Sequence, residues 1–79
     1  MALHFVVYGR PYCHLCHDLV AGLQQLQTRH EFSFDVVDID QDAQLEERFG
    51  TLIPVVEYNG KILCNYFLDE TAIVSALAG

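Results

Sequence analysis

Gly9-Arg10-Pro11-Tyr12-Cys13-His14-Leu15-Cys16 separates two hydrophobic patterns of different period. Before it, Leu3–Tyr8 is a short apolar run rich in Val and aromatic residues, which predicts a buried strand. The Gly and the Pro predict a turn. After them, apolar residues recur at helical spacing, which predicts an amphipathic helix over Cys13–Gln27. The apolar positions of this helix are Leu15, Leu19, Val20, Leu23 and Leu26.

The rest of the chain supplies five more predicted elements. Phe32–Ile39 alternates and is rich in Phe, Val and Ile, so it predicts a second strand. An Asp from the acidic set at positions 38, 40 and 42 can cap a short helix over Ala43–Phe49, and Gly50 fits the C-terminal cap. Pro54 opens a strand to Tyr58, Asn59-Gly60 predicts a hairpin, and Lys61–Tyr66 is the returning strand. Asp69 then caps a last helix over Thr71–Leu77.

This order, β-α-β-α-β-β-α, predicts an α/β fold with a four-stranded mixed sheet covered by helices. The first β-α-β unit should be a right-handed parallel crossover, and the hairpin adds an antiparallel pair. Because 79 residues are too few for two domains, we expect one domain over residues 1–79.

Acidic residues outnumber basic residues, since eleven Asp and Glu face four Lys and Arg for a formal charge of −7. Such a surplus would repel a phosphate backbone and an anionic membrane surface, so we expect no nucleic-acid and no membrane partner. The apolar start of the chain lacks the basic region and cleavage site of a secretion signal. We therefore expect a cytoplasmic protein, in which thiols stay reduced.

The cysteine pair is the strongest candidate for chemistry. Residues three apart in a helical turn lie on the same side, with Cα atoms close enough for a disulfide. Cys13 stands where the helix begins, and the unpaired N–H groups and the positive dipole end there favour its nucleophilic thiolate. Arg10, His14 and His17 can add positive charge. Cys16 lies one turn deeper and suits the resolving thiol.

Three segments resemble a known family. Tyr12–Cys16 resembles the active-site turn of thioredoxins and glutaredoxins, residues 49–56 resemble the loop that holds their cis-proline, and Tyr58–Lys61 resembles their hairpin. The likeness spans essentially the whole chain, and the short spacing before the proline is most similar to a glutaredoxin-like family of small proteins. The resemblance implies a thioredoxin-like fold in which the Ile53–Pro54 bond is cis and forms the second wall of the site.

The same resemblance implies a thiol–disulfide oxidoreductase that reduces or exchanges disulfides. The Cys13 thiolate would attack the substrate disulfide, and Cys16 would resolve the mixed disulfide. The predicted substrate-binding residues are Arg10, Tyr12, His14, Ile53 and Pro54. We expect the substrate to be a disulfide-containing protein or a small thiol and the protein to be a monomer with no bound cofactor. An external reductant, such as a thioredoxin-type system, would reset the pair.

Glutathione is the co-substrate that the resemblance admits but that the sequence argues against. Glutathione-using glutaredoxins carry a Gly-Gly pair and then an Asp after the last strand, whereas these positions fall at about Cys64-Asn65 and Phe67. Asp69-Glu70 could supply the acid if the loop were longer by two residues. His14 also stands where glutaredoxins commonly have proline. We therefore predict weak or absent glutathione-coupled activity.

Other interpretations of the cysteines remain open. Residues 13–17 also match the C-x-x-C-H pattern of haem attachment, although that needs an exported chain and an axial ligand such as Met, and the only Met is the first residue. With a histidine, the pair offers ligands for zinc, copper or a bridged iron–sulfur cluster, and metal or cluster binding is the alternative function. A non-enzymatic binding module is a third. Cys64 is interpreted as a small core residue.

Overall fold

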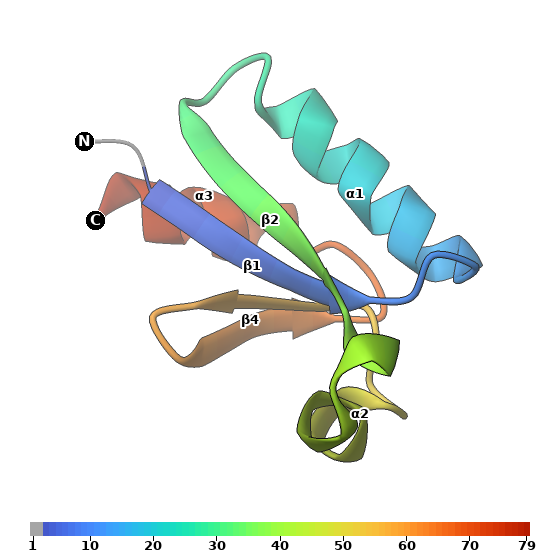
Figure 1. The fold of residues 1–79 in the computed structure, drawn as a ribbon. Coiled ribbons are helices and arrows are strands. Elements are labelled where there is room, and N and C mark those ends of the chain that lie inside the picture. Colours follow the sequence, from blue (N-terminus) through green and yellow to red (C-terminus); the bar gives the residue numbers. More distant parts are fainter. Residues whose placement is uncertain (1–2) are drawn as a thin grey trace.

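The computed structural model describes residues 3–79 and contains every predicted helix and strand in the predicted order (Figure 1). The elements are β1 (Leu3–Gly9), α1 (His14–Leu26), β2 (Phe32–Asp38), the 3-10 turn η1 (Ile39–Gln41), α2 (Ala43–Phe49), β3 (Val55–Tyr58), β4 (Lys61–Asn65) and α3 (Glu70–Ala78). Only η1 is absent from the sequence prediction, which extended the second strand to Ile39. None of the helices in the described part of the chain is long and apolar enough to cross a membrane.

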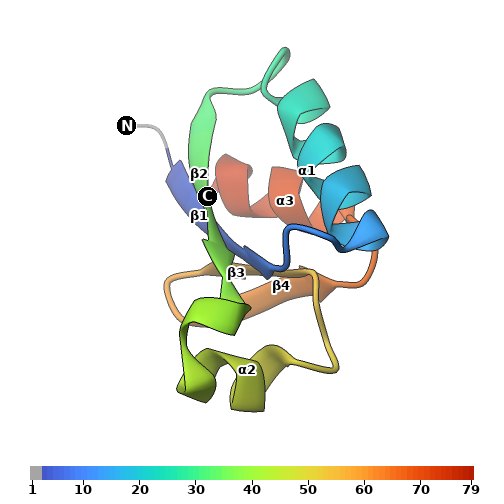
Figure 2. The same cartoon turned by 45° about the vertical axis from the view of Figure 1, so that its right-hand side comes forward.

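The four strands form one mixed sheet in the order β2-β1-β3-β4. β1 and β2 are parallel and in unbroken register, whereas β3 is antiparallel to both β1 and β4. Asn59 and Gly60, with φ of 50° and 80°, close the β3–β4 hairpin, because such a turn needs two left-handed residues. α1 and α3 share one face of the sheet, and α2 lies apart from them (Figure 2). This is the thioredoxin-like α/β architecture that the sequence predicts.

The main hydrophobic cluster lies between the sheet and the helices α1 and α3. Phe5 and Val7 alternate along β1 and are fully buried against one side of α1 and Ile73 of α3. The ring of Phe5 meets that of Phe32 edge to face, with centroids 5.4 Å apart. The buried residues of α1 are Cys16, Leu19, Leu23 and Leu26.

One detail of the prediction is wrong. Leu15 is exposed, and Cys16 takes the buried place on the first turn, because Cys16, Leu19, Leu23 and Leu26 form the row that faces β1. Gly50 is the C-cap of α2, as predicted, and it has right-handed helical geometry with a φ of −54°. Glycine is needed there for space, since a Cβ would lie 2.5 Å from the backbone oxygen of Glu46.

The aspartates at positions 38, 40 and 42 have different roles. The Asp38 side chain accepts from the Asp40 backbone N–H and caps η1, and the Asp42 side chain accepts from the N–H groups of Gln44 and Leu45 and caps α2. The Asp69 side chain caps α3 as predicted. Asp40 caps nothing, and its side chain is directed toward the cysteine turn.

Candidate active site

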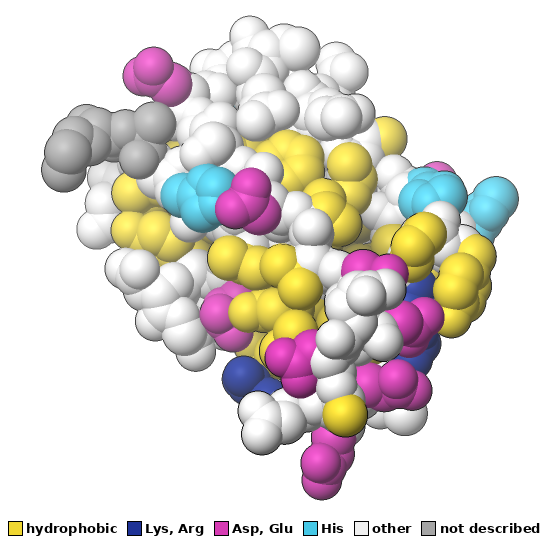
Figure 3. Space-filling model, viewed as in Figure 1, with side chains coloured by type: hydrophobic (Ala, Val, Ile, Leu, Met, Phe, Trp, Pro, Cys, Tyr) yellow, Lys and Arg dark blue, Asp and Glu magenta, His cyan; other side chains and the backbone are white. Residues whose placement is uncertain are grey.

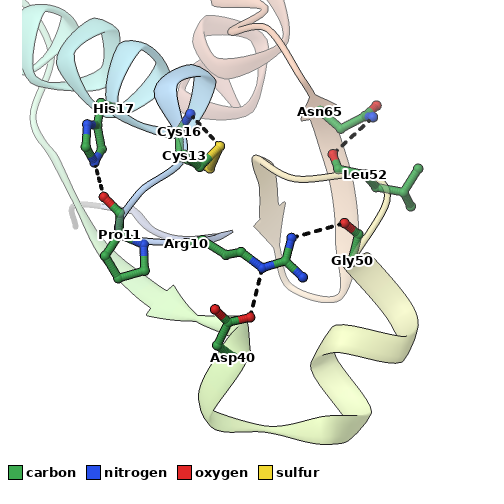
Figure 4. The surroundings of a disulfide bond; sticks show 9 residues. All are labelled: Arg10, Pro11, Cys13, Cys16, His17, Asp40, Gly50, Leu52 and Asn65. Atoms are coloured by element: carbon green, nitrogen blue, oxygen red, sulfur yellow. Dashed lines mark hydrogen bonds and ion pairs between the residues drawn. A yellow bond between two sulfur atoms is a disulfide. The ribbon is translucent and has the colours of Figure 1, made fainter.

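Cys13 and Cys16 lie at the junction between the end of β1 and the first turn of α1 (Figure 4). Cys13 is the N-cap of α1, with extended backbone geometry, rather than a residue of its first turn. Its sulfur accepts a hydrogen bond from the Cys16 backbone N–H at 3.2 Å. The two residues form a disulfide, with Cα atoms 5.2 Å apart. A cysteine at this position therefore receives a backbone donor as well as the positive end of the helix.

The two sulfurs differ in exposure. Cys13 is half-buried, whereas Cys16 is only 3% exposed. Cys16 is buried because it packs against Gly9 at the end of β1, where a Cβ would lie 2.9 Å from its sulfur. The first cysteine is thus the one that an incoming molecule can reach, and the second lies behind it.

The proline loop stands at the same end of the sheet. The Ile53–Pro54 bond is cis, as the resemblance implies. β1 and β3 pair Tyr8 with Val55, and one further step of this antiparallel register brings Pro54 beside Gly9, against which Cys16 packs. The loop therefore lies next to the cysteine turn.

Two residues that the sequence reasoning missed hold this loop in place. The Asn65 side chain donates to the Leu52 carbonyl at 3.3 Å, and the Tyr66 hydroxyl donates to the Thr51 carbonyl at 2.6 Å. The Tyr66 backbone N–H also donates to the Pro54 carbonyl at 2.8 Å. Tyr66 has a φ of 64°, the left-handed geometry that usually selects glycine. No pattern along the chain marks these contacts, because they join positions more than ten residues apart.

Arg10 and Tyr12 both turn toward Asp40. The Arg10 guanidinium donates to Asp40 at 2.8 Å, to Glu46 at 3.3 Å and to the Gly50 carbonyl at 3.4 Å. The Tyr12 hydroxyl donates to the other oxygen of Asp40 at 2.7 Å. Arg10 and, to a lesser degree, Tyr12 hold the pKa of Asp40 below its ordinary value. These contacts tie the cysteine turn to η1 and α2, and they leave the charge of Arg10 shared with two carboxylates.

The remaining sequence candidates lie around the pair. The His17 ring is directed at the Pro11 carbonyl, and His14 is exposed. Cys64 is half-buried on β4, where burial raises the pKa of its thiol. Among residues 3–79, no three His, Cys, Asp or Glu side chains come together as a group that could hold a metal ion.

The chain is similar to several solved structures. Protein Ne2328 from Nitrosomonas europaea is 38% identical, with a TM-score of 0.87 over 98% of this chain and 93% of that one. Protein XcR50 from X. campestris is 33% identical, with a TM-score of 0.72 over 94% of this chain and 95% of that one. Thioredoxin from Fasciola hepatica, at 21% identity and a TM-score of 0.60 over 98% of this chain and 79% of that one, shares the fold.

A comparison with curated protein sequences finds no match. The model of the glutaredoxin-like domain (DUF836) matches residues 4–78. This span contains the cysteine turn, the cis-proline loop and all of β1 except its first residue. The fold, the cysteine turn and this match agree, and the chain belongs to the glutaredoxin-like domain (DUF836) family.

Proposed function

We propose that this protein is a thiol–disulfide oxidoreductase in which Cys13 is the nucleophile and Cys16 the resolving thiol. The observation that carries the proposal is the asymmetry of the pair. Cys13 is accessible at the helix N-terminus, with the Cys16 N–H 3.2 Å from its sulfur, whereas Cys16 is buried behind it. A helix N-terminus and a backbone donor both favour a thiolate over a thiol.

The reaction then follows in two exchanges. The reduced Cys13 thiolate attacks one sulfur of a substrate disulfide, forms a mixed disulfide and releases the other substrate sulfur as a thiolate, which takes up a proton. Cys16 loses its proton and attacks the Cys13 sulfur, which releases the second substrate thiol. The substrate gains two electrons and two protons, and the protein is left with the Cys13–Cys16 disulfide. An external dithiol must return two electrons before the next cycle.

The cis-proline loop would form the other wall of the substrate site. Its backbone is fixed by Asn65 and Tyr66, and it stands beside the strand end from which the cysteine turn leaves. Tyr12 in the cysteine turn and Phe67, which lines a hollow with Leu15 of the first turn of α1, are exposed and present apolar surface. An extended substrate segment that carries a disulfide could rest its backbone on the loop and its side chains on these rings.

A dithiol reductant of the thioredoxin type fits this site better than glutathione. Phe67 is 70% exposed and stands where the family resemblance places an acid. Asp69, which could replace that acid, already accepts from the Ala72 N–H at 3.1 Å as the cap of α3. Cys64 and Asn65, where a glycine pair would admit the ligand, belong to β4. We propose that glutathione-coupled turnover is weak for these reasons.

The proposal is tested with three matched cysteine variants. In an insulin-reduction assay coupled to thioredoxin reductase, Cys13→Ser should abolish turnover and Cys64→Ser should leave it unchanged. Cys16→Ser should complete only the first exchange and accumulate a mixed disulfide on Cys13, visible as a mass shift that dithiothreitol removes. Mass-spectrometric mapping of the reduced protein should find Cys13 alkylated first near neutral pH. Alkylation of Cys16 or Cys64 ahead of Cys13, or an active Cys13→Ser variant, would show that the assignment is wrong.

The reductant is tested separately, by comparing turnover with thioredoxin reductase and with millimolar glutathione plus glutathione reductase. Turnover with glutathione that equals the thioredoxin-coupled rate and persists in Phe67→Ala would contradict the argument about the missing pocket. That result would leave the two-cysteine mechanism intact.

A further inference from the structure

β2 presents an edge that nothing in the described chain covers. Within residues 3–79 it pairs with β1 alone, over seven residues in unbroken register. In a parallel pair, alternate residues direct both the N–H and the C=O away from the neighbour, so the outer side of β2 carries a row of unpaired backbone groups.

β4, the strand at the other edge of the sheet, has features that protect it from pairing with a further strand. β4 is five residues long, begins with Lys61, and pairs with β3 through a register shift at Val56/Glu57. A short strand, a lysine and a bulge are the features that discourage strand addition. β2 has none of the three, since it contains no Lys, Arg or Pro and no bulge.

A hollow of about 410 Å³ lies beside this edge, between α1 and β2. Its lining includes Val20 and Ala21 of α1, Val36 of β2, and Gly9 and Cys16. Figure 3 shows hydrophobic side chains gathered in this space, with acidic side chains along β2 beside them. Val36 points to the same side of the sheet as buried Val7, its register partner, yet it is 55% exposed. α1 therefore leaves the outer part of this apolar surface open.

The charges along the edge select the occupant. Asp35 is the central residue of β2, lies on the opposite face from Val36, and has a side chain that is 76% exposed even with His4 against it at 3.0 Å. A second copy paired antiparallel about the centre of β2 would set Asp35 against Asp35, which is unfavourable. Glu31 precedes the strand and Asp38 is its last residue, and both add negative charge. The negative charge along this edge thus disfavours that pairing of two copies and favours a positively charged strand.

We propose that β2 is a docking edge for an extended segment of a partner protein in which apolar residues alternate with Lys or Arg. Side chains on an added strand alternate between the two faces of the sheet. The apolar residue next to Val36 would enter the hollow, and the basic residues on either side of it would lie on the opposite face, one of them beside Asp35. The hollow also reaches Arg10 and Pro11 of the cysteine turn, but Cys13 is not among its lining residues. The docked segment would therefore lie beside the site of the proposed reaction without occupying the place of the Cys13 sulfur.

The test uses the ¹⁵N-labelled protein and a synthetic peptide, Lys-Val-Lys-Val-Lys-Val-Lys. Titration should produce saturable shifts confined to β2 and to the residues that line the hollow, such as Gly9 and Ala21. Val36→Lys removes the apolar contact with the valine of the peptide, so it should weaken peptide binding about tenfold or more. Ala21→Gln, which fills the hollow from the helix side, should weaken it as well.

The controls separate docking from simple charge attraction. Ile62→Lys places the same charge on the opposite edge strand, at an aliphatic residue that is 45% exposed, and should bind like wild type. A peptide with Pro for the central Val, which loses a backbone donor, should bind more weakly. Circular dichroism verifies that each variant is folded. The proposal fails if no saturable shift occurs up to about 1 mM peptide, if Val36→Lys and Ile62→Lys bind equally, or if shifts spread over all acidic residues.

Discussion

Gly9→Ala is a small change at the back of the cysteine pair with a cost that the structure allows to be worked out. Gly9 is buried, and a Cβ there would lie 2.9 Å from the Cys16 sulfur and 3.2 Å from the Cys16 Cβ. Neither atom can move far, because Cys16 sits on the buried side of α1 and Gly9 is part of β1. Overpacking of this kind costs about 1–3 kcal/mol. Replacing glycine by alanine also lowers the conformational entropy of the unfolded chain, which offsets about 0.4–1 kcal/mol of this loss.

We therefore expect Gly9→Ala to lower the free energy of unfolding by about 1–2 kcal/mol. For a domain of this size, that corresponds to a fall in Tm of roughly 4–16 °C. Urea denaturation followed by Tyr fluorescence measures it, with dithiothreitol present so that only the reduced protein is compared.

A double-mutant cycle identifies the cause. Cys16→Ala removes the sulfur that the new Cβ meets, so the cost of Gly9→Ala should fall by about 1 kcal/mol in that background. An equal cost in both backgrounds would refute the argument, since the loss would then come from the strand and not from the cysteine. A cost below about 0.5 kcal/mol in the wild-type background would refute it too.

Three further predictions concern the core, a cap and a surface contact. Leu23→Ala, which opens a cavity under α1 at a fully buried position, should cost about 2–5 kcal/mol in urea denaturation; a smaller loss would mean that the core collapses around the site. Asp69→Ala should cost about 1 kcal/mol and Asp69→Asn much less, because asparagine also caps helices; equal losses would contradict a capping role. Arg10 and then Tyr12 lower the pKa of Asp40. The stabilisation from these contacts is therefore fully present above the unfolded pKa of about 3.9, and it is lost as pH falls through the lower pKa of the folded state. Asp40→Asn should therefore lose less stability on acidification than wild type, and parallel pH curves would contradict this.

The elements of the fold could be predicted from the sequence because each depends on a local pattern. Alternation along β1, the helical spacing of Leu19, Leu23 and Leu26, and the turn residues Asn59-Gly60 all act over a few residues. The proximity of Cys13 and Cys16 is local as well, since three residues of helix bring them together. On α1, periodicity predicts the wrong burial only for Leu15, which is exposed. Cys16 is buried instead, because the rotation of α1 about its axis turns Cys16 toward β1.

The site beyond the cysteine pair depends on contacts between distant segments. Sequence reasoning could assign Arg10 a charge but not its partners, which lie 30 to 40 residues further along the chain. Asp40 has the same side chain as the capping residues Asp38 and Asp42, and only its contacts with Arg10 and Tyr12 of the cysteine turn distinguish it from them. The support of the proline loop by Tyr66 has no sequence signal at all.

What the sequence determined by itself is therefore the order of the elements, the turn types and the cysteine spacing, because these are set by periods and by the φ preferences of a few residues. What only the tertiary structure decided is which residue of the first helical turn faces β1, where the charge of Arg10 goes, and that β2 keeps an open edge beside a hollow. These features depend on how α1 is rotated and placed over the sheet, and that is a property of the whole packed core rather than of any one segment.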